Sequence, residues 1–489
     1  MTGHGRIRGG RPQALRIMDA MRQRSRDTIA VDDASLTLPR VIARPTLADL
    51  REALLWLVVI AGVLNFGATM FSQSSVSTQT VWAKGAKDVP AALLLALLAY
   101  EVVKRRSLAN RRDLRRLTAA VAALAAYMAL SALAIASPAA GDAVSAQYYL
   151  VYPLLAVGLA AVPLSAQQVD RFLRLFIALG VLESLLAIPD ALAVFAHTYY
   201  SFYYHGTLFN RAVGTLGNPN NLGLFLGLCL IIAASNAARL PAAVRVASIA
   251  LMVVGIMLTL SKTAPIALAV SLFFLTYGPP RRRAMLEVGA IAAALVVAYA
   301  AVVIRSGLTA PPVASAPVAA ATAGSTGGRS SSQGASGGSQ PASPATTAPV
   351  ASAVGNRGQT GRAALDQWTS SPKAFLVGSG FATLADVGSG GKLDERVVDN
   401  MALGLALEGG VLGLALVGLV IIAALWPLIR AGARDPLVDI ARAYSLFFLL
   451  YTPVAVNLRL FPVALFFWVI LGLGLATVGR GSSAAPGAG

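Results

Sequence analysis

The sequence predicts an all-α polytopic membrane protein with about twelve transmembrane helices and one large extracytoplasmic loop. Composition is the first reason: 56% of the 489 residues are hydrophobic and 13% are charged, against about 25% charged residues in a typical soluble domain. Apolar runs of roughly 20 residues recur along the chain, and a helix needs this length to cross a bilayer. Lysines and arginines gather in alternate connections between these runs, as the positive-inside rule expects.

The apolar runs define a series of spans on both sides of the large loop. In chain order they are residues 52–71, 89–103, 117–136, 148–165, 173–196, 220–238, 246–261, 264–278, 285–304, 400–425, 443–457 and 461–479. Residues 246–278 also fit one interrupted helix, but Lys262 and Pro265 favour a break between two spans. Spans one to nine therefore occupy 52–304 and spans ten to twelve occupy 400–479, between a basic tail at 1–51 and a short tail at 480–489.

Basic residues give the chain a direction across the membrane. The connections at 104–116, 239–245, 281–283 and 430–442 are rich in arginine, and all fall on one side of the predicted topology. The positive-inside rule places this side, and both termini with it, in the cytoplasm. The same rule accounts for the net charge of +18 without nucleic acid, because no basic stripe is interleaved with aromatic residues.

The extracytoplasmic loop, residues 305–399, has two halves of different composition. Residues 308–355 consist mainly of Ala, Pro, Ser, Gly and Thr without periodicity, so we expect this half to be disordered. Residues 356–399 contain Trp368, Phe375, Phe381 and a mixture of charges. This second half predicts an ordered lid, with one or two short helices packed on the membrane domain.

Several cations on the outer side lack obvious acidic neighbours in the sequence: Arg211, Lys262, Arg362 and Arg459. Arginine forks match the oxygens of a diphosphate and lysine adds a point charge, so the set favours an anion site at the membrane surface. Individually, Arg211 and Arg459 also fit interfacial residues whose side chains extend toward the lipid headgroups. The one cysteine, Cys229, and the three histidines lack metal-ligand spacing, so we expect no metal and no cofactor.

Other polar residues have both structural and functional interpretations. Asn218 and Asp399 each precede an apolar run and fit helix N-caps, a role as well supported for Asp399 as catalysis. Glu408 would lie about 13 Å deeper along the tenth span, at 1.5 Å per residue. A carboxylate at that depth must face the bundle interior and have a partner, and the same rule applies to Glu183 and Asp190.

Four of these stretches, taken in order, resemble motifs of the O-antigen polymerase/ligase superfamily (Wzy/WaaL type). Residues 211–221, Arg-Ala-Val-Gly-Thr-Leu-Gly-Asn-Pro-Asn-Asn, resemble its R-x-x-G-T-x-x-N-P-N segment. Residues 260–263, Leu-Ser-Lys-Thr, resemble its S-R-[TG] element, with lysine in place of arginine. The third stretch, with Arg362, Trp368, Pro372 and Gly378-Ser379-Gly380, resembles its R…W…P…G-x-G loop. The fourth, with Asp399-Asn400, Glu408-Gly409 and Gly413, resembles its [HD]-N…E-x-G…G pattern. The ordered set covers roughly residues 200–425.

The resemblance implies an inverting, metal-independent glycosyltransferase of GT-C-like architecture at the outer face of a bacterial inner membrane. Its donor would be a polyprenyl-diphosphate-linked oligosaccharide, and a chain-length regulator is a further expected partner. Carried onto this chain, the motifs imply Arg211 and Arg362 as diphosphate or transition-state contacts and Asp399 as a base or an orienter of the acceptor. The substrate-binding set is completed by Lys262, Arg459, Asn218, Asn400, Trp368 and Glu408.

The acceptor and the class of protein have alternatives. Ligases that transfer O-antigen to lipid A–core typically carry His where this chain has Asp399, and no histidine follows His205. This departure favours a polymerase, whose acceptor is another lipid-linked repeat unit, for O-antigen or exopolysaccharide. A lipid or solute transporter stays open because Glu183 and Asp190 lie inside a predicted span, and a non-enzymatic assembly protein is a third alternative.

Overall fold

The computed structural model describes residues 46–64, 81–109, 111–135, 147–192, 194, 201–204, 207–261, 263–276, 361–362, 364–381, 400–431, 435–453, 458 and 462–483. The chain divides into two units, residues 1–50 and 51–489. Within the first unit, the Asp49 N–H donates to Thr46 Oγ1 at 3.2 Å and the Thr46 N–H donates to Asp49 Oδ2 at 3.0 Å. This reciprocal cap satisfies two amides at the start of the first described helix.

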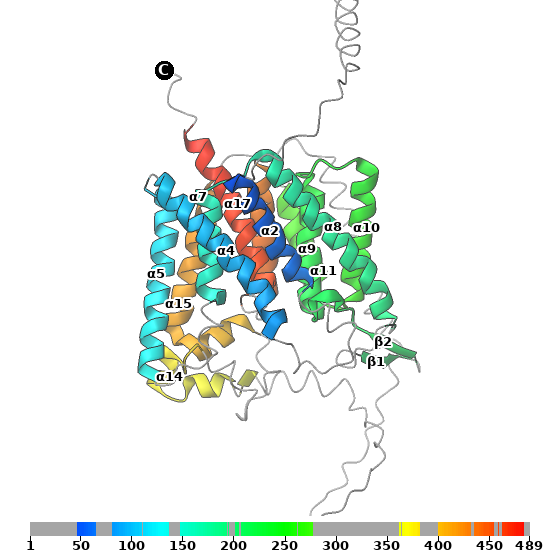
Figure 1. The fold of residues 1–489 in the computed structure, drawn as a ribbon. Helices are drawn as coiled ribbons and strands as arrows, with labels where there is room; N and C mark the ends of the chain where they lie inside the picture. The colour runs from blue at the N-terminus through cyan, green and yellow to red at the C-terminus, as the bar shows by residue number, and fades with distance from the viewer. Residues whose placement is uncertain are drawn as a thin grey trace, which may run out of the picture. The chain divides into compact units, whose positions relative to one another are not determined.

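The described elements are helices and one hairpin (Figure 1). The α-helices are α2 (Leu47–Leu64), α4 (Val81–Arg105), α5 (Arg112–Ile135), α7 (Tyr152–Ala161), α8 (Ala166–Ala191), α9 (Pro219–Ser235), α10 (Ala242–Leu258), α11 (Thr263–Thr276), α14 (Pro372–Val377), α15 (Met401–Arg430), α16 (Pro436–Tyr451) and α17 (Val463–Ser483). A π-helical turn, η2 (Gln147–Val151), precedes α7, and a 3-10 turn, η3 (Gly214–Leu216), precedes α9. The strands β1 (Ser201–Tyr204) and β2 (Thr207–Asn210) pair antiparallel with Phe202 opposite Phe209, so the all-α prediction missed a hairpin.

Helices occupy the predicted spans wherever the structure describes them. A helix lies in each predicted range except the ninth, 285–304, which falls outside the described residues. Three of the described helices are long and apolar enough to cross a membrane, namely Arg112–Leu133, Ala166–Ala191 and Met401–Arg430. Shorter apolar helices cover Tyr148–Ala161, Pro219–Ser235, Ala242–Leu258, Thr263–Phe273 and Val463–Val478. The predicted break within 246–278 is confirmed, because α10 ends at Leu258 and α11 begins at Thr263.

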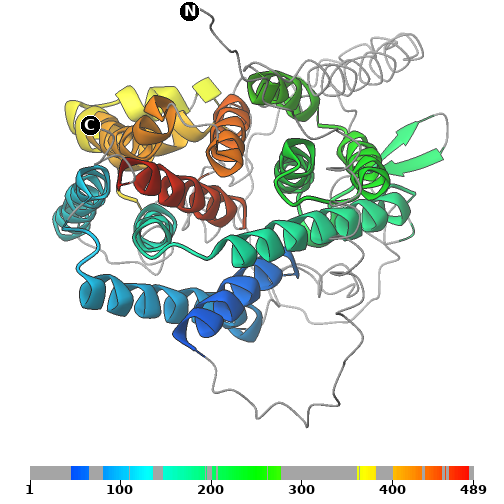
Figure 2. The same cartoon turned by 90° about the horizontal axis from the view of Figure 1, so that it is seen from above.

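The centre of the bundle consists of helices that are apolar on every face. Residues 463–476 of α17 and 221–233 of α9 are buried without interruption, and so are 155–161 of α7. A helix that is hydrophobic all round must be surrounded by other helices. Seen down the bundle, α7 and α17 lie side by side in the interior (Figure 2). Aromatic stacking adds to this packing, with Phe448 and Phe467 at 4.1 Å between ring centroids.

The outer faces of the surrounding helices are also apolar. Leu133 on α5 is 81% exposed, Val246 on α10 is 61% exposed and Ile429 on α15 is 63% exposed. A soluble protein rarely presents such large apolar side chains over several neighbouring helices. These faces are therefore compatible with helices whose outer surface contacts lipid.

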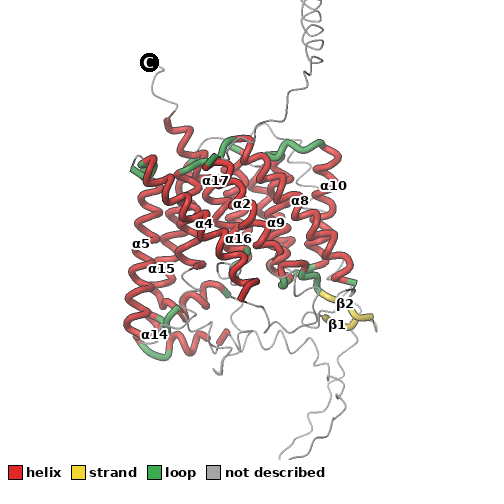
Figure 3. Tube along the Cα trace, viewed as in Figure 1, coloured by secondary structure: helices red, strands yellow, loops and turns green. Residues whose placement is uncertain are grey.

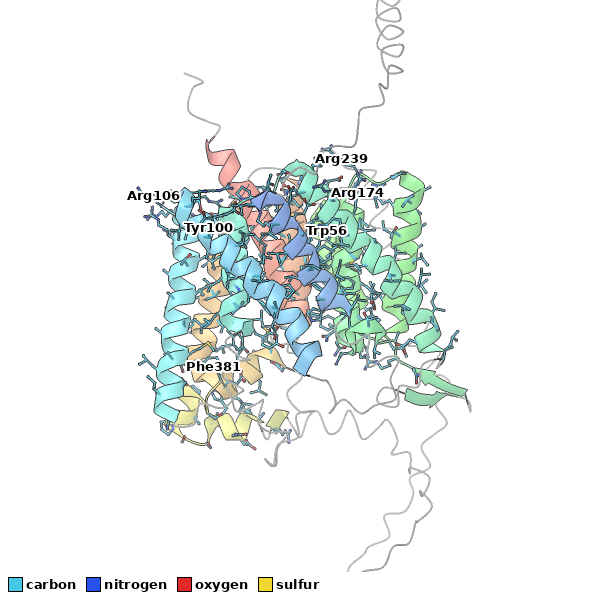
Figure 4. All side chains as sticks on the ribbon, in the orientation of Figure 1. Trp56, Tyr100, Arg106, Arg174, Arg239 and Phe381 are labelled. Atoms are coloured by element: carbon cyan, nitrogen blue, oxygen red, sulfur yellow. The ribbon has the colours of Figure 1, made fainter. Side chains whose placement is uncertain are left out.

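The two ends of the bundle differ in chemistry. Arg106, Arg174 and Arg239 lie at one end, here called the basic end, and Phe381 lies at the opposite end, here called the loop end (Figure 4). The hairpin strands and α14 also lie at the loop end (Figure 3). Arg106 and Arg239 come from two of the connections predicted to share one side, and they lie at the same end. Ion pairs link helices there, for example Arg51 to Glu101 at 2.7 Å.

Candidate functional site

Two buried carboxylates on α8 bind the backbone of the segment that precedes α9. Asp190 accepts hydrogen bonds from the N–H groups of Val213 at 2.7 Å and Gly214 at 3.1 Å. Glu183 accepts one from the Thr215 N–H at 3.0 Å and one from the Thr215 hydroxyl. Both carboxylates are fully buried. The prediction that they face the interior and have partners is confirmed, and both bind backbone N–H groups of the loop before α9.

This anchoring predicts a stability role for Glu183. In Glu183→Ala, the Thr215 amide loses its acceptor inside the protein, and hydrogen bonds to charged groups contribute about 1.5–3 kcal/mol each. We expect a loss of roughly 3 kcal/mol in unfolding free energy, measured by thermal unfolding of the detergent-solubilised protein. Glu183→Gln keeps one acceptor oxygen and should lose about half as much. A transport residue would behave differently: both variants would lose activity at unchanged stability.

Arg211 is held by the turn between α10 and α11. Its Nε donates to the Thr259 carbonyl at 3.0 Å, and the Ala212 N–H donates to the Leu258 carbonyl at 3.0 Å. The turn itself is tight, because Leu260 adopts a left-handed backbone with φ of 50°. Arg211 is only partly buried, so its guanidinium is fixed at Nε while part of the side chain stays accessible.

Tyr451, at the end of α16, joins this turn to the start of α9. Its hydroxyl donates to Asn220 Oδ1 at 3.1 Å and lies within hydrogen-bond distance of Ser261 Oγ. The next residue, Thr452, accepts a hydrogen bond at its carbonyl from the Met401 N–H at 3.1 Å. The segments at 211–221 and 259–261, the end of α16 and the start of α15 therefore meet at one place.

Replacing Tyr451 tests this junction. Tyr451→Phe removes one hydroxyl that serves two partners, and each net hydrogen bond is worth about 1 kcal/mol, so we expect roughly a 30-fold loss of the protein's activity. Tyr444→Phe on the same helix is the matched control. Tyr444 is fully buried and its hydroxyl has no hydrogen-bond partner among the described residues, so this variant should be neutral or slightly stabilising. Equal activity in the two variants would remove Tyr451 from the site.

Both asparagines of the predicted site cap helices. Asn218 Oδ1 accepts the Asn220 N–H at 2.8 Å at the start of α9, which confirms the predicted N-cap. Asn400 Oδ1 accepts the Leu403 N–H at 3.1 Å at the start of α15. The prediction that Asp399 caps this helix is therefore wrong, because the chain turns into the helix one residue later. Asp399 itself lies outside the described residues, as do Lys262 and Arg459.

The helix α15 is kinked where the loop end of the bundle closes. Gly410 has φ of 61° and ψ of −166°, which ends one helical segment and starts the next. Residues 378–380 bind the carbonyls exposed at this kink: the Ser379 N–H donates to Leu407 and the Gly380 N–H to Glu408, both at 2.9 Å. The predicted tenth span thus consists of two helical segments that meet at this kink.

Glu408 lies in the first of these segments and is fully buried. The Tyr149 hydroxyl donates to Glu408 Oε2 at 3.4 Å, so the prediction of an inward-facing, partnered carboxylate is confirmed. Phe381 packs edge-on against Tyr149 and Tyr127, with centroids 5.7 Å and 6.0 Å away. The Tyr127 hydroxyl lies 2.7 Å from the Gly409 carbonyl oxygen and 3.1 Å from that of Val377. These contacts fasten the loop to α15 beside the carboxylate.

Within the second half of the large loop, the described residues include short helices, as the sequence predicted. A helical segment at 364–369 leads to α14, which contacts α15. Trp368 donates from Nε1 to the Phe375 carbonyl at 3.2 Å and stacks on the Phe375 ring at 5.1 Å between centroids. The structure thus gives Trp368 a packing role. Arg362 is exposed at the start of this region.

Sequence reasoning missed the tyrosines that join these parts. Tyr127, Tyr149 and Tyr451 lie in apolar runs and carry no motif spacing, so only the folded structure brings their hydroxyls to the loop end. Among the described residues, no three His, Cys, Asp or Glu side chains form a group that could hold a metal ion. Comparisons with protein-family models and with curated proteins found no match.

Proposed function

We propose that the protein is a polysaccharide polymerase of a bacterial inner membrane. It would join polyprenyl-diphosphate-linked repeat units of O-antigen or exopolysaccharide by inverting, metal-independent glycosyl transfer. The observation that carries this proposal is that four stretches far apart in the sequence, 211–221, 259–261, 378–380 and 400–410, are linked by contacts in the structure. Residues 378–380 bind the first segment of α15, and the 211–221 and 259–261 stretches are joined to each other and to the end of α16, which contacts the start of α15. Each of these stretches overlaps one of the four that resemble motifs of the O-antigen polymerase/ligase superfamily.

The topology belongs to the proposal as well. Twelve spans would place both termini and the basic end in the cytoplasm, and the loop end with the active site in the periplasm. A lipid-linked donor requires this arrangement, because its diphosphate lies at the membrane surface while its polyprenyl chain stays in the bilayer. The apolar outer faces of α5, α10 and α15 support contact with such a lipid.

The proposed chemistry uses positioning and charge. The leaving group is already a diphosphate, so the protein must hold it, stabilise its growing charge and aim an acceptor hydroxyl at the anomeric carbon. Arg211 and Arg362 would bind the diphosphate, with Lys262 and Arg459 adding charge. Asp399 would orient the acceptor or accept its proton, beside the capped start of α15 at Asn400. An Asp starts with a pKa well below neutral, which suits orientation better than proton abstraction.

Reconstitution tests the proposal directly. The full-length protein is placed in lipid nanodiscs with a chemically defined polyprenyl-diphosphate-linked repeat unit, with or without lipid A–core. Products are separated by length. Longer lipid-linked polymer supports the polymerase, and transfer to lipid A–core only would identify a ligase. Movement of the lipid-linked unit across a vesicle membrane without a new glycosidic bond would identify a transporter.

A further inference from the structure

The connection between α4 and α5 carries a group of exposed cations at the basic end of the bundle, the end opposite the candidate site (Figure 4). Residues 101–116 contain seven basic and two acidic side chains. Four of the basic residues, here called the turn patch, are exposed and form no ion pair among the described residues: Lys104, Arg106, Arg112 and Arg115. The proposed glycosyl transfer does not use them.

Both acidic side chains of this segment are bound by other arginines. Glu101 pairs with Arg51 at 2.7 Å and with Arg105 at 2.8 Å. Asp113 pairs with Arg111 at 2.6 Å. Each carboxylate of the segment therefore has its own arginine, and neither neutralises the turn patch.

Other arginines of the basic end stabilise the fold. Arg111 donates to the carbonyls of Ala160 at 3.3 Å and Leu475 at 2.9 Å, which fastens the connection to α7 and α17. Arg174 pairs with Asp170 at 2.8 Å. The turn patch differs from these neighbours, because the connection is fixed in place while its four cations remain available to an external anion.

Three residues of the turn patch occupy positions that are unfavourable for folding. Arg106 follows the last residue of α4 and has a left-handed backbone with φ of 50°, where a helix that ends in this way usually has glycine. Arg112 and Arg115 lie in the first turn of α5, where the helix dipole disfavours cations. The positive-inside rule depends on the number of Lys and Arg residues and does not require them at these positions. Their placement therefore indicates binding.

An exposed apolar surface lies beside the turn patch on α4. Tyr100 is 55% exposed and Val103 is 76% exposed. Lys104 Nζ lies 5.6 Å from the centroid of the Tyr100 ring. Residues three and four apart share one face of a helix, so the ring, the valine and the lysine form one surface. Apolar side chains next to unpaired cations suit the boundary between lipid acyl chains and headgroups.

We propose that the turn patch binds an anionic phospholipid with two phosphate groups in its headgroup, as cardiolipin has. Lys104 and Arg106 at the end of α4 bind one phosphate, and the acyl chains lie along the exposed apolar face of α4. Arg112 and Arg115 at the start of α5 bind the other phosphate. Guanidinium groups match phosphate oxygens, and a single phosphate would leave half of the patch without an anion. The inference requires a membrane protein whose basic end lies at a leaflet surface, but it is independent of the proposed glycosyl transfer.

Binding is measured on the purified, delipidated full-length protein in detergent, by native mass spectrometry with four probes. These are cardiolipin, phosphatidylglycerol, phosphatidylcholine and inorganic diphosphate. Each lysine or arginine that meets an anionic lipid contributes about a factor of five, so cardiolipin should bind about 25-fold more tightly than phosphatidylglycerol, which meets only one pair of cations. Phosphatidylcholine should bind more weakly still, because its headgroup has no net charge. Inorganic diphosphate should bind weakly, since it has no acyl chains to contact α4.

Arg106→Gly separates binding from folding. The substitution removes one cation and gives the left-handed position the residue that adopts it without strain. Cardiolipin binding should weaken about fivefold, while the thermal unfolding temperature of the lipid-free protein stays the same or rises. Arg239→Gly is the matched control: Arg239 is also exposed with φ of 49°, but it lies at the other side of the basic end (Figure 4), so binding should not change.

The second phosphate contact is tested by a double variant, Arg112→Gln with Arg115→Gln. Glutamine is also a good helix former, so α5 should be retained. With this pair removed, cardiolipin has only the pair on α4 to meet. It should then bind about as tightly as phosphatidylglycerol binds the parent protein.

Four results would overturn the proposal. Equal binding of phosphatidylcholine would remove the role of the cations, and equal binding of phosphatidylglycerol would remove the second phosphate. Equal binding of inorganic diphosphate would assign the patch to a soluble anion. Unchanged cardiolipin binding in Arg106→Gly and in the double variant, or the same loss in Arg239→Gly, would place the lipid elsewhere on the protein.

Discussion

Arg211→Ala is expected to abolish polymer formation while the protein still inserts and folds. The structure fixes the side chain of Arg211 through its Nε, which donates to the Thr259 carbonyl at 3.0 Å. Removal of a group that stabilises transition-state charge typically lowers the rate by about 100- to 1000-fold. The lost hydrogen bond to Thr259 costs only about 1 kcal/mol of stability, so the effect on activity should far exceed the effect on folding.

Conservative replacement separates charge from geometry at this position. Arg211→Lys keeps the positive charge but loses the planar fork and the Nε contact, so activity should remain well below that of the parent protein. Arg116→Ala, an exposed arginine near the start of α5, controls for loss of positive charge and should polymerise normally. Activity is measured as the length distribution of polymer made from a defined lipid-linked repeat unit. Normal chain length in Arg211→Ala would exclude Arg211 from the active site.

The helical part of the fold could be predicted because each span has its own apolar run. The ranges 220–238 and 246–261, for example, contain most of α9 and most of α10, since burial in a bundle or in lipid requires the same residue types. The break before α11 was also visible, from Lys262 and Pro265. The hairpin at 201–210 was missed, because two strands of four residues leave too little alternating pattern to separate from a polar connection.

Four residues of the predicted site lie among the described residues with defined contacts, but the sequence could not predict which side chains they would contact. Arg211, Asn218, Asn400 and Glu408 were named from motifs, and the structure places each on or beside the segments that meet around α15, α9 and α16. Contacts such as that of Tyr451 with Asn220 join side chains more than 200 residues apart, for which sequence spacing carries no information. The carboxylates of Glu183 and Asp190 were expected to need partners. Residue identities could not show that these partners would be backbone N–H groups.

The backbone conformation of Gly410 divides the tenth span into two helical segments, which the sequence did not predict. At φ of 61° and ψ of −166°, the backbone lies in a region that is essentially open to glycine alone. The sequence of an apolar helix does not show whether a glycine is simply a small residue or the site of a kink. For Gly410, only its contact with the docked loop in the structure identifies the kink. An added Cβ would lie 2.3 Å from the backbone carbon of Leu376, so the docked loop would have to move.

Gly410→Ala is therefore expected to release residues 376–381 from α15. Backbone strain of about 1–3 kcal/mol adds to the clash, and both are relieved when the loop leaves the kink. The amides of Ser379 and Gly380, which donate to Leu407 and Glu408 at 2.9 Å, should then exchange hydrogen much faster. Polymer formation should fall with them, because the contacts of Phe381 and Tyr127 that fasten the loop beside Glu408 are lost together.

A second glycine of the same helix supplies the matched control. An added Cβ at Gly418 would meet no atom within 4 Å, so Gly418→Ala should stabilise α15 by about 0.5–1 kcal/mol and leave exchange at Ser379 and Gly380 unchanged. Gly378→Ala tests the other side of the contact, where a Cβ would lie 2.3 Å from the Glu408 carbonyl oxygen. If Gly410→Ala and Gly378→Ala retain slow exchange and full activity, the kink is only a packing detail. If both lose them while Gly418→Ala does not, the docked loop is a working part of the site, since two substitutions on opposite chain segments share only that contact.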